Sequence, residues 1–142
     1  MIKLTDIKLA INKLIYNELG IKVTSNTVKD SFSVPAIFTS IEPINYEHLT
    51  ENIEQQYLMC IVHYFPSKGE GDLDRLEMSE RLKRIFNMKL KVKDRYLNVE
   101  NIRESIVDDT LMFKFNLFYH QDKGRVEEGE KMQEIIIERN DV

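Results

Sequence analysis

The only cysteine of the chain, Cys60, lies three residues before one of its three histidines, His63, in the stretch QYLMCIVHYFPSK. A thiolate and an imidazole at this spacing could form half of a metal site, or a nucleophile with its general base. The alternation of β-branched and aromatic residues in this stretch predicts a strand instead. Successive strand side chains point to opposite faces, so a separation of three keeps the two groups apart unless a bulge intervenes. We therefore expect Cys60 to be a small buried residue and His63 a hydrogen-bonded histidine near a strand end.

Other motifs that carry chemistry are absent from the sequence. The glycines of GEGD have neither the spacing nor the following Lys-Ser/Thr of a phosphate loop, and no serine lies in a G-x-S-x-G setting. There is no His-Glu-x-x-His motif and no second cysteine, while His48 and His120 have no obvious partners. A general acid/base pair of carboxylates is the alternative left open. We expect no catalytic residue, no cofactor and no metal ion.

The composition indicates one compact domain. The chain has 142 residues, of which 42% are hydrophobic, and we place the domain at 1–122 and a C-terminal arm at 123–142. One cysteine excludes an intrachain disulfide. The start of the chain has no secretory signal pattern, and no apolar run approaches the roughly 18 residues of a membrane span. The net charge of -4 argues against general binding to nucleic acid.

Two helices are expected from apolar residues that recur at spacings of three and four. The first has Ile7, Ile11, Leu14, Ile15 and Leu19 on one face, with Thr5 as its cap and Gly20 as its terminator. The second spans about 72–87, with Asp72 as a plausible cap. Its apolar stripe consists of Leu73, Leu76, Met78, Leu82, Ile85 and Phe86.

About six strands complete the pattern. Short strands are expected at 21–26 and 36–43, where Pro43 either ends the strand or lies at a sheet edge, and 44–52 is expected to be a polar connection. The Cys60 stretch is expected to be a central strand covered on both faces. Hairpins are expected with turns at Lys93-Asp94 and Asp108-Asp109. The fold class is therefore α+β: a mostly antiparallel sheet of about five to six strands, two helices on one face and an extended C-terminal arm.

Charge is distributed unevenly along the chain. Between residues 81 and 95 seven basic residues face one acidic residue, a net charge of +6, whereas residues 121–142 have four basic and seven acidic residues, a net charge of -3. These can be two solvated faces, or surfaces that complement each other within one chain or between copies. Lys89, Lys91 and Lys93 alternate with apolar residues on one predicted strand face. We favour an acidic protein surface over phosphate as their partner, because no pattern in the sequence indicates side chains that recognise nucleic-acid bases.

The segment after Gln121 differs in character from the rest. QDKGRVEEGE predicts a flexible arm, and it is followed by three isoleucines flanked by charge, Ile135 to Ile137. This apolar run could be the last strand of the chain's own sheet. Alternatively, it could add to the sheet or surface of a neighbouring copy.

Four stretches together resemble the tail terminator (tail completion) proteins of phages of Gram-positive bacteria and of related phage-tail-like particles. They are LTDIKLAINKLI, VKDSFSVPAIFTSIEP, YLMCIVHYFPS and KVKDRYLNVENIRESIVDDTLMFKFNLFY, and they cover most of residues 1–120 in the expected order. None of them is a catalytic signature. The resemblance implies an α+β fold and a structural role, with no catalytic residues to transfer.

The resemblance further implies a homo-oligomeric ring, usually a hexamer, on the head-proximal end of the tail tube. Such a ring stops tube polymerisation and offers a surface for head completion proteins or for the end of a sheath. Its lumen would leave a passage for DNA, and assembly would take place in the cytoplasm of the bacterial host. The alternatives are a head–tail connector ring of the same particle, and a small hydrolase or ligand-binding domain that uses His63 and carboxylates.

A closed ring repeats one heterologous contact, which two complementary surfaces of one chain can supply. We therefore hypothesise that the acidic arm of one subunit reaches the basic strand face of its neighbour. The basic side consists of Lys89, Lys91, Lys93 and Arg95. The arm contributes Glu127, Glu128, Glu130, Glu134, Ile135, Ile136 and Ile137.

Overall fold

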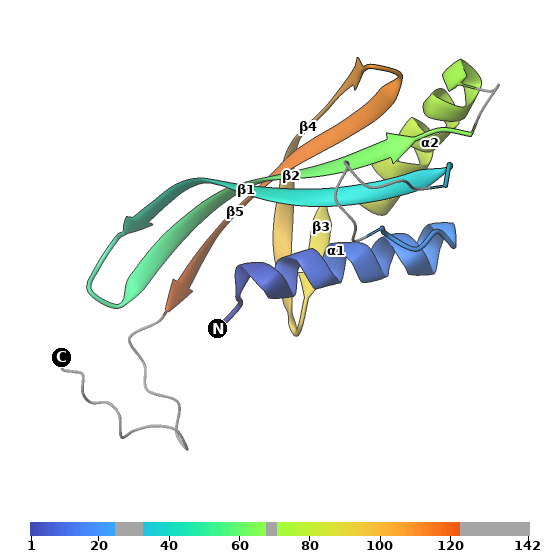
Figure 1. The fold of residues 1–142 in the computed structure, drawn as a ribbon. Helices are drawn as coiled ribbons and strands as arrows, with labels where there is room; N and C mark the ends of the chain where they lie inside the picture. Colours follow the sequence, from blue (N-terminus) through green and yellow to red (C-terminus); the bar gives the residue numbers. More distant parts are fainter. Residues whose placement is uncertain (25–32, 68–70, 123–142) are drawn as a thin grey trace.

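The computed structural model describes residues 1–24, 33–67 and 71–122 (Figure 1). It contains α1 (Leu4–Leu19), β1 (Ala36–His48), β2 (Ile53–Phe65), α2 (Gly71–Ile85), β3 (Lys89–Val92), β4 (Arg95–Val107) and β5 (Thr110–Asp122). The strands form one five-stranded sheet in the order β1-β2-β5-β4-β3, and every neighbouring pair is antiparallel. The α+β class is confirmed, and the five strands lie at the lower end of the expected number.

The hydrophobic core lies between the two helices and one face of the sheet. Phe86, which directly follows α2, stacks on Phe115 of β5 with ring centroids 4.8 Å apart. The inward side chains of β5 are buried along the whole strand: Leu111, Phe113, Phe115, Leu117 and Tyr119. The helices contribute Ile7, Ile11, Ile15, Met78 and Leu82, and β2 contributes Leu58, Cys60, Val62 and Tyr64.

The first helix ends as expected but begins differently. Lys3, and not Thr5, occupies the position before the first helical turn. The Asp6 carboxylate replaces the expected cap, because it accepts a hydrogen bond from the Lys3 backbone N–H at 2.9 Å and carries negative charge near the helix N-terminus. Gly20 adopts a left-handed conformation (φ 74°) and donates its N–H to the Tyr16 carbonyl, which terminates the helix.

The apolar stripe predicted for the second helix is too broad. The inward face of the helix consists of Arg75, Met78, Ser79 and Leu82. Leu73 and Leu76 lie outside this face and are exposed. Asp72 lies inside the first turn and is not the cap.

Two strand predictions in the first half of the chain are wrong. β1 continues to His48, so the expected connection at 44–52 is partly strand. Pro43 lies at the sheet edge, one of the two positions expected for it, and the register with β2 shifts between Pro43 and Asn45. Residues 21–24 form no strand, and 25–26 lie outside the described residues. Thr24 instead makes a backbone hydrogen bond to the Ile37 carbonyl at 2.8 Å.

Both hairpins expected in the second half are confirmed. Asp108 and Asp109 both have positive φ (51° and 63°), the conformation of a tight two-residue turn that matches strand twist. The β3–β4 turn places Lys93 at φ 57°. Within β4 the pairing with β5 shifts register between Glu100 and Arg103, and Asn101 at φ 54° lies inside this irregularity.

The helices leave the second face of the sheet uncovered, so the expectation that β2 is covered on both sides is wrong. In Figure 1, α1 and α2 lie on the same side of the sheet. On the opposite face, Ile61 is buried among its strand neighbours, whereas Tyr57, Met59, His63 and Phe65 are half-buried.

Candidate functional site

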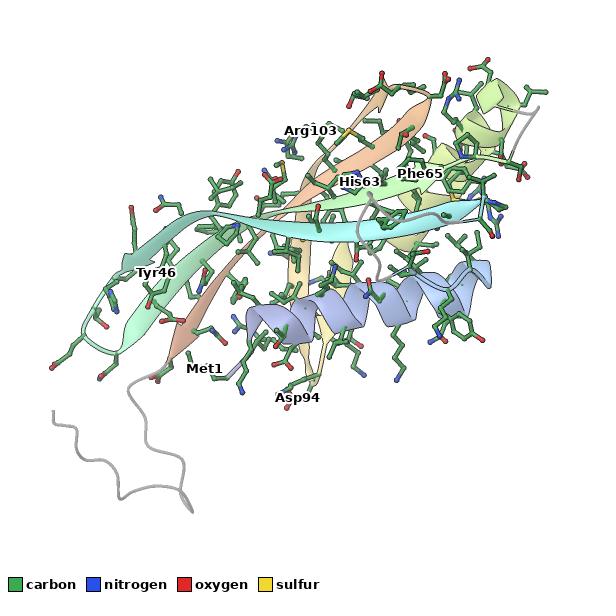
Figure 2. All side chains as sticks on the ribbon, viewed as in Figure 1. Met1, Tyr46, His63, Phe65, Asp94 and Arg103 are labelled. Carbon is green, nitrogen blue, oxygen red and sulfur yellow. The ribbon has the colours of Figure 1, made fainter. Side chains whose placement is uncertain are left out.

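Cys60 and His63 lie on opposite faces of β2, as their spacing predicted. Cys60 is buried under the helices, and this burial raises the pKa of its thiol to about 12, which keeps it protonated at neutral pH. His63 points to the uncovered face (Figure 2), where its Nε2 lies 3.3 Å from the Ser40 hydroxyl. Burial is the main cause that lowers the pKa of His63. The pair therefore provides neither a shared metal site nor a nucleophile beside its base.

Replacing Cys60 by serine or alanine should leave the fold unchanged. We expect a loss of about 1 kcal/mol in the free energy of unfolding, because only one small buried group changes. The thiol of the native protein should react with a thiol reagent only after unfolding, which a comparison of native and denatured samples measures. Rapid modification of the native protein, or a variant that fails to fold, would contradict the assignment of Cys60 as a small buried residue.

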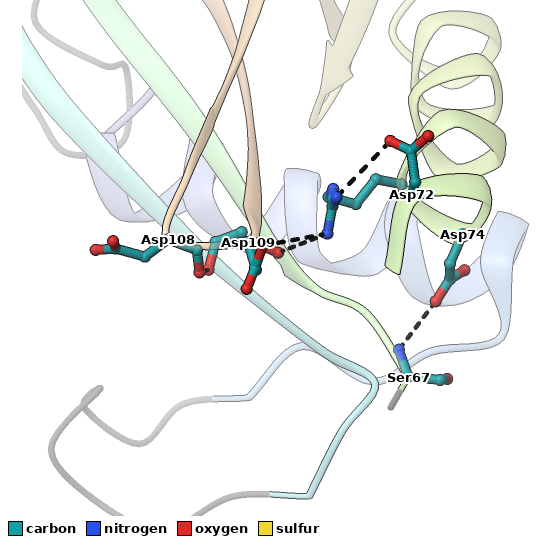
Figure 3. Close-up of polar contacts among 7 residues, drawn as sticks. Ser67, Asp72, Asp74, Asp108 and Asp109 are labelled. Carbon is teal, nitrogen blue, oxygen red and sulfur yellow. Dashed lines mark hydrogen bonds and ion pairs between the residues drawn. The ribbon is translucent and has the colours of Figure 1, made fainter. Parts of the chain in front are cut away.

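The remaining groups that could do chemistry make structural contacts. Asp74 accepts hydrogen bonds from the Tyr64 hydroxyl and from the Ser67 N–H, which fixes the start of α2 against the end of β2. Figure 3 shows the contact with Ser67. Across the described residues, no three His, Cys, Asp or Glu side chains gather as metal ligands. None of the described helices has the length and apolar content needed to span a membrane.

The β3–β4 hairpin carries the four basic residues of the hypothesised interface. Leu90 and Val92 are buried beneath it, whereas Lys89 and Lys91 are exposed. Lys91 Nζ lies 5.7 Å from the centre of the Tyr96 ring. This part of the hairpin presents two ammonium groups with no carboxylate partner among the described residues.

The other two basic residues have partners within the subunit. Lys93 Nζ lies 3.2 Å from Asp6 Oδ2 of α1. Arg95 donates a hydrogen bond to the His120 carbonyl of β5, and its guanidinium lies over the Tyr119 ring. Asp6 and His120 are far from the hairpin in sequence, so residue spacing gave no indication of these contacts. Lys89 and Lys91 are therefore better placed for a partner molecule than Lys93 and Arg95.

A groove between the hairpin and α1 extends the basic surface. Its cationic side chains include Lys13, which sequence reasoning missed because nothing in the sequence indicates that α1 packs beside β3. Leu9, 65% exposed, contributes apolar surface. The complete lining is Asp6, Leu9, Ala10, Lys13, Leu14, Asn17, Lys91 and Lys93. The predicted arm residues Glu127, Glu128, Glu130, Glu134 and Ile135 to Ile137 lie outside the described residues.

A polar network crosses the uncovered face of the sheet. Arg103 of β4 extends over this face (Figure 2), donating to Met59 Sδ at 2.9 Å and to Asn116 Oδ1 at 3.3 Å. Asn116 in turn donates to the Tyr57 hydroxyl at 2.9 Å. These contacts link three strands, and they make this face a mixed polar and apolar surface.

The end of β5 is fixed beside the start of α1. The Gln121 side chain accepts a hydrogen bond from the Ile2 N–H at 2.6 Å and donates one to the Ile2 carbonyl at 3.2 Å. Gln121 also donates to Glu54, which accepts a further hydrogen bond from the Tyr46 hydroxyl. The chain after Asp122 therefore starts from a defined point at this end of the sheet.

Comparison with known proteins identifies the family. A family model described as phage tail terminator protein matches residues 6–130, a span that includes all five strands, α2 and nearly all of α1. A comparison with curated protein sequences finds no match. The resemblance noted in the sequence is confirmed at the level of the family, and the protein is accordingly a structural component of the virion tail. The chain belongs to the phage tail terminator family.

Proposed function

We propose that this protein forms a ring, a hexamer, that caps the head-proximal end of the tail tube. The ring stops tube polymerisation and offers a surface for a head completion protein or for the end of a sheath. The observation that carries the proposal is the family match over all but a few of the described residues. The protein acts by assembly, with no catalytic step, and it assembles in the cytoplasm of the bacterial host.

The exposed side chains of the β3–β4 hairpin support a ring contact. A cyclic ring requires two different surfaces on each subunit, because every copy meets one neighbour on each side. Lys89 and Lys91 form a cationic surface, while the sequence from 127 to 138 has five glutamates against one basic residue, Lys131. The acidic arm of one subunit lies against this hairpin of the next. Lys93 and Arg95 contribute less, because each already has a partner within its own subunit.

Removal of the gene from the phage or particle tests the capping function. Without a terminator, tubes should grow beyond their normal length, which electron microscopy of purified tails measures directly. Restoring the gene in trans should restore normal length. Tails of normal length that lack only heads would contradict the proposal and would favour a head–tail connector.

A charge reversal tests the hairpin contact separately. We expect Lys89→Glu/Lys91→Glu to weaken ring assembly by about tenfold or more, because two attractions become repulsions, and the effect should diminish in high salt. The matched control is Lys22→Glu/Arg84→Glu, which reverses two exposed charges outside the β3–β4 hairpin. Equal defects in both variants would indicate a general effect of charge and would contradict the contact.

A further inference from the structure

One outer edge of the sheet is blocked against pairing. Along β1, the outward carbonyl of Ile37 accepts the Thr24 N–H, and the carbonyl of Thr39 accepts the Lys8 ammonium at 2.6 Å. Pro43, further along the same strand, has no N–H to donate. Outward carbonyls that already accept hydrogen bonds, and a proline that lacks an N–H, prevent another strand from adding to this edge.

The opposite edge is open along part of β4. β3 pairs with β4 only from Arg95 to Asn98, and the Val99 N–H bonds to the Met88 carbonyl. After the register shift, β4 has no strand on its outer side from Arg103 to Val107 within the described part of the chain. Because the two-residue turn makes Val107 and Thr110 a hydrogen-bonded pair, the backbone groups of Glu104 and Ile106 point outward.

An apolar groove lies beside this open edge. Leu76 of α2 and Ile106 of β4 line it and are 55% and 50% exposed, while the buried Leu111 is also part of its lining. Glu104, at the groove wall, accepts a hydrogen bond from Ser79 and lies 3.5 Å from Lys83 Nζ. The open edge therefore has adjoining apolar surface onto which the side chains of an added strand could pack.

Contacts near the N-terminal end of α2 fix the position of the helix beside the groove. Arg75 donates a hydrogen bond to the carbonyl of the turn residue Asp109 at 3.3 Å and lies within ion-pair distance of the Asp72 carboxylate (Figure 3). Arg75 therefore joins α2 to the β4–β5 turn, and the hydrogen bond from Ser79 to Glu104 joins α2 to β4 at the groove wall. A docking site that is already formed costs less ordering free energy on binding.

We propose that the segment Glu134–Glu138 of one subunit, EIIIE, adds as a strand along Arg103–Val107 of its neighbour. This inference rests on the proposed ring and names the surface that accepts the arm. β-branched residues favour strand structure, and addition to a free edge uses backbone hydrogen bonds for affinity. In such a strand Ile135 and Ile137 share one face, so they enter the groove together, while Ile136 faces the side of Ser105.

The distance along β5 favours a neighbour over the same subunit. Ile135 would lie beside Glu104, which pairs with Phe113, whereas Asp122 ends β5 nine residues after Phe113, about 30 Å away at 3.3 Å per residue. The 13 residues from Asp122 to Ile135 span at most about 45 Å when fully extended, and a coil of that length spans about 20 Å on average. The subunit's own segment would therefore have to extend to about one and a half times its average coil length, whereas a neighbouring subunit can place its edge closer.

The spacing of charges along the arm matches the same path. On β4, Asn98 and Tyr96, which pair with Lys89 and Lys91, precede Ser105 by seven and nine residues. In the arm, Glu130 and Glu128 precede Ile136, which faces the side of Ser105, by six and eight residues, and the one extra residue of β4 at its register shift accounts for the difference. A strand that runs parallel to β4 thus brings these glutamates to Lys89 and Lys91 when the isoleucines lie at the open edge. The basic hairpin and the open edge become two parts of one contact.

Disulfide cross-linking between two full-length proteins tests the docking. One carries Ser105→Cys, the other carries Ile136→Cys and a mass tag, and the buried Cys60 is retained in both. We expect the mixed dimer to form at least tenfold faster than with Glu42→Cys, an exposed position on the same sheet face at the blocked edge. Equal rates at the two edges would overturn the proposal. So would a doubly substituted chain whose disulfide closes only within itself.

The cross-link and the tail length report different properties. If tails lengthen on gene removal but the Ser105–Ile136 cross-link is absent from assembled tails, the docking is wrong and the capping function stands. If the cross-link forms while gene removal leaves tail length unchanged, the docking stands and the capping function is wrong.

Discussion

Phe115→Ala should lower the free energy of unfolding by about 3–5 kcal/mol, the largest stability effect that we expect from a single substitution in this chain. Phe115 is fully buried on the helix side of β5, stacks on Phe86 and lies 6.1 Å from the centre of the Phe113 ring. Truncation would leave a cavity between α2 and the sheet that surrounding side chains fill only in part. Urea unfolding followed by circular dichroism measures the loss.

Phe118→Ala is the matched control for this substitution. Phe118 lies on the same strand but on the uncovered face, where it is 36% exposed and makes an edge contact with Tyr57. We expect a loss of no more than about 1.5 kcal/mol, because the side chain already contacts solvent and removal leaves no enclosed cavity. Similar losses at Phe115 and Phe118 would show that the two faces of the sheet are equally covered, contrary to the structure.

The contrast between these two phenylalanines also explains what the sequence could predict. The period of two along β5 determines which residues share a face, and the turn residues Asp108 and Asp109 mark where the strand begins. The pattern does not determine how many layers cover the sheet. β2 has apolar residues on both faces, as a strand buried on both sides would, yet both helices pack on one side. The uncovered apolar residues therefore look like core residues in the sequence.

Edges and partners were the least predictable features of the candidate site. Whether β4 has an open edge depends on the short length of β3 and on the register shift near Asn101, which leave no signal in local residue types. The alternation of lysines correctly indicated an exposed strand face at Lys89 and Lys91. It could not indicate that Lys93 meets Asp6, because that contact requires α1 to lie beside the hairpin.

Deletion of residues 125–142 should abolish or severely impair ring formation while leaving the fold intact. The described residues already form a continuous core between both helices and the sheet, so we expect the melting temperature to change by no more than about 2 °C. The truncated protein loses both the glutamates and the isoleucines proposed to contact the neighbour. Tail length by electron microscopy and ring assembly by analytical ultracentrifugation, with and without tail tubes, measure the effect.

Single substitutions test the contribution of the isoleucine run to assembly, with the glutamates of the arm unchanged. Ile137→Asp keeps the full chain but places a charge in the apolar groove that Ile135 and Ile137 are proposed to enter, and we expect it to reproduce most of the assembly defect. Ile137→Val, which preserves a β-branched apolar side chain, should assemble normally. A truncated protein that caps tails normally would end the proposed role of the arm. A truncated protein that melts far below the full chain would place the isoleucine run in the subunit's own sheet, the alternative that the sequence left open.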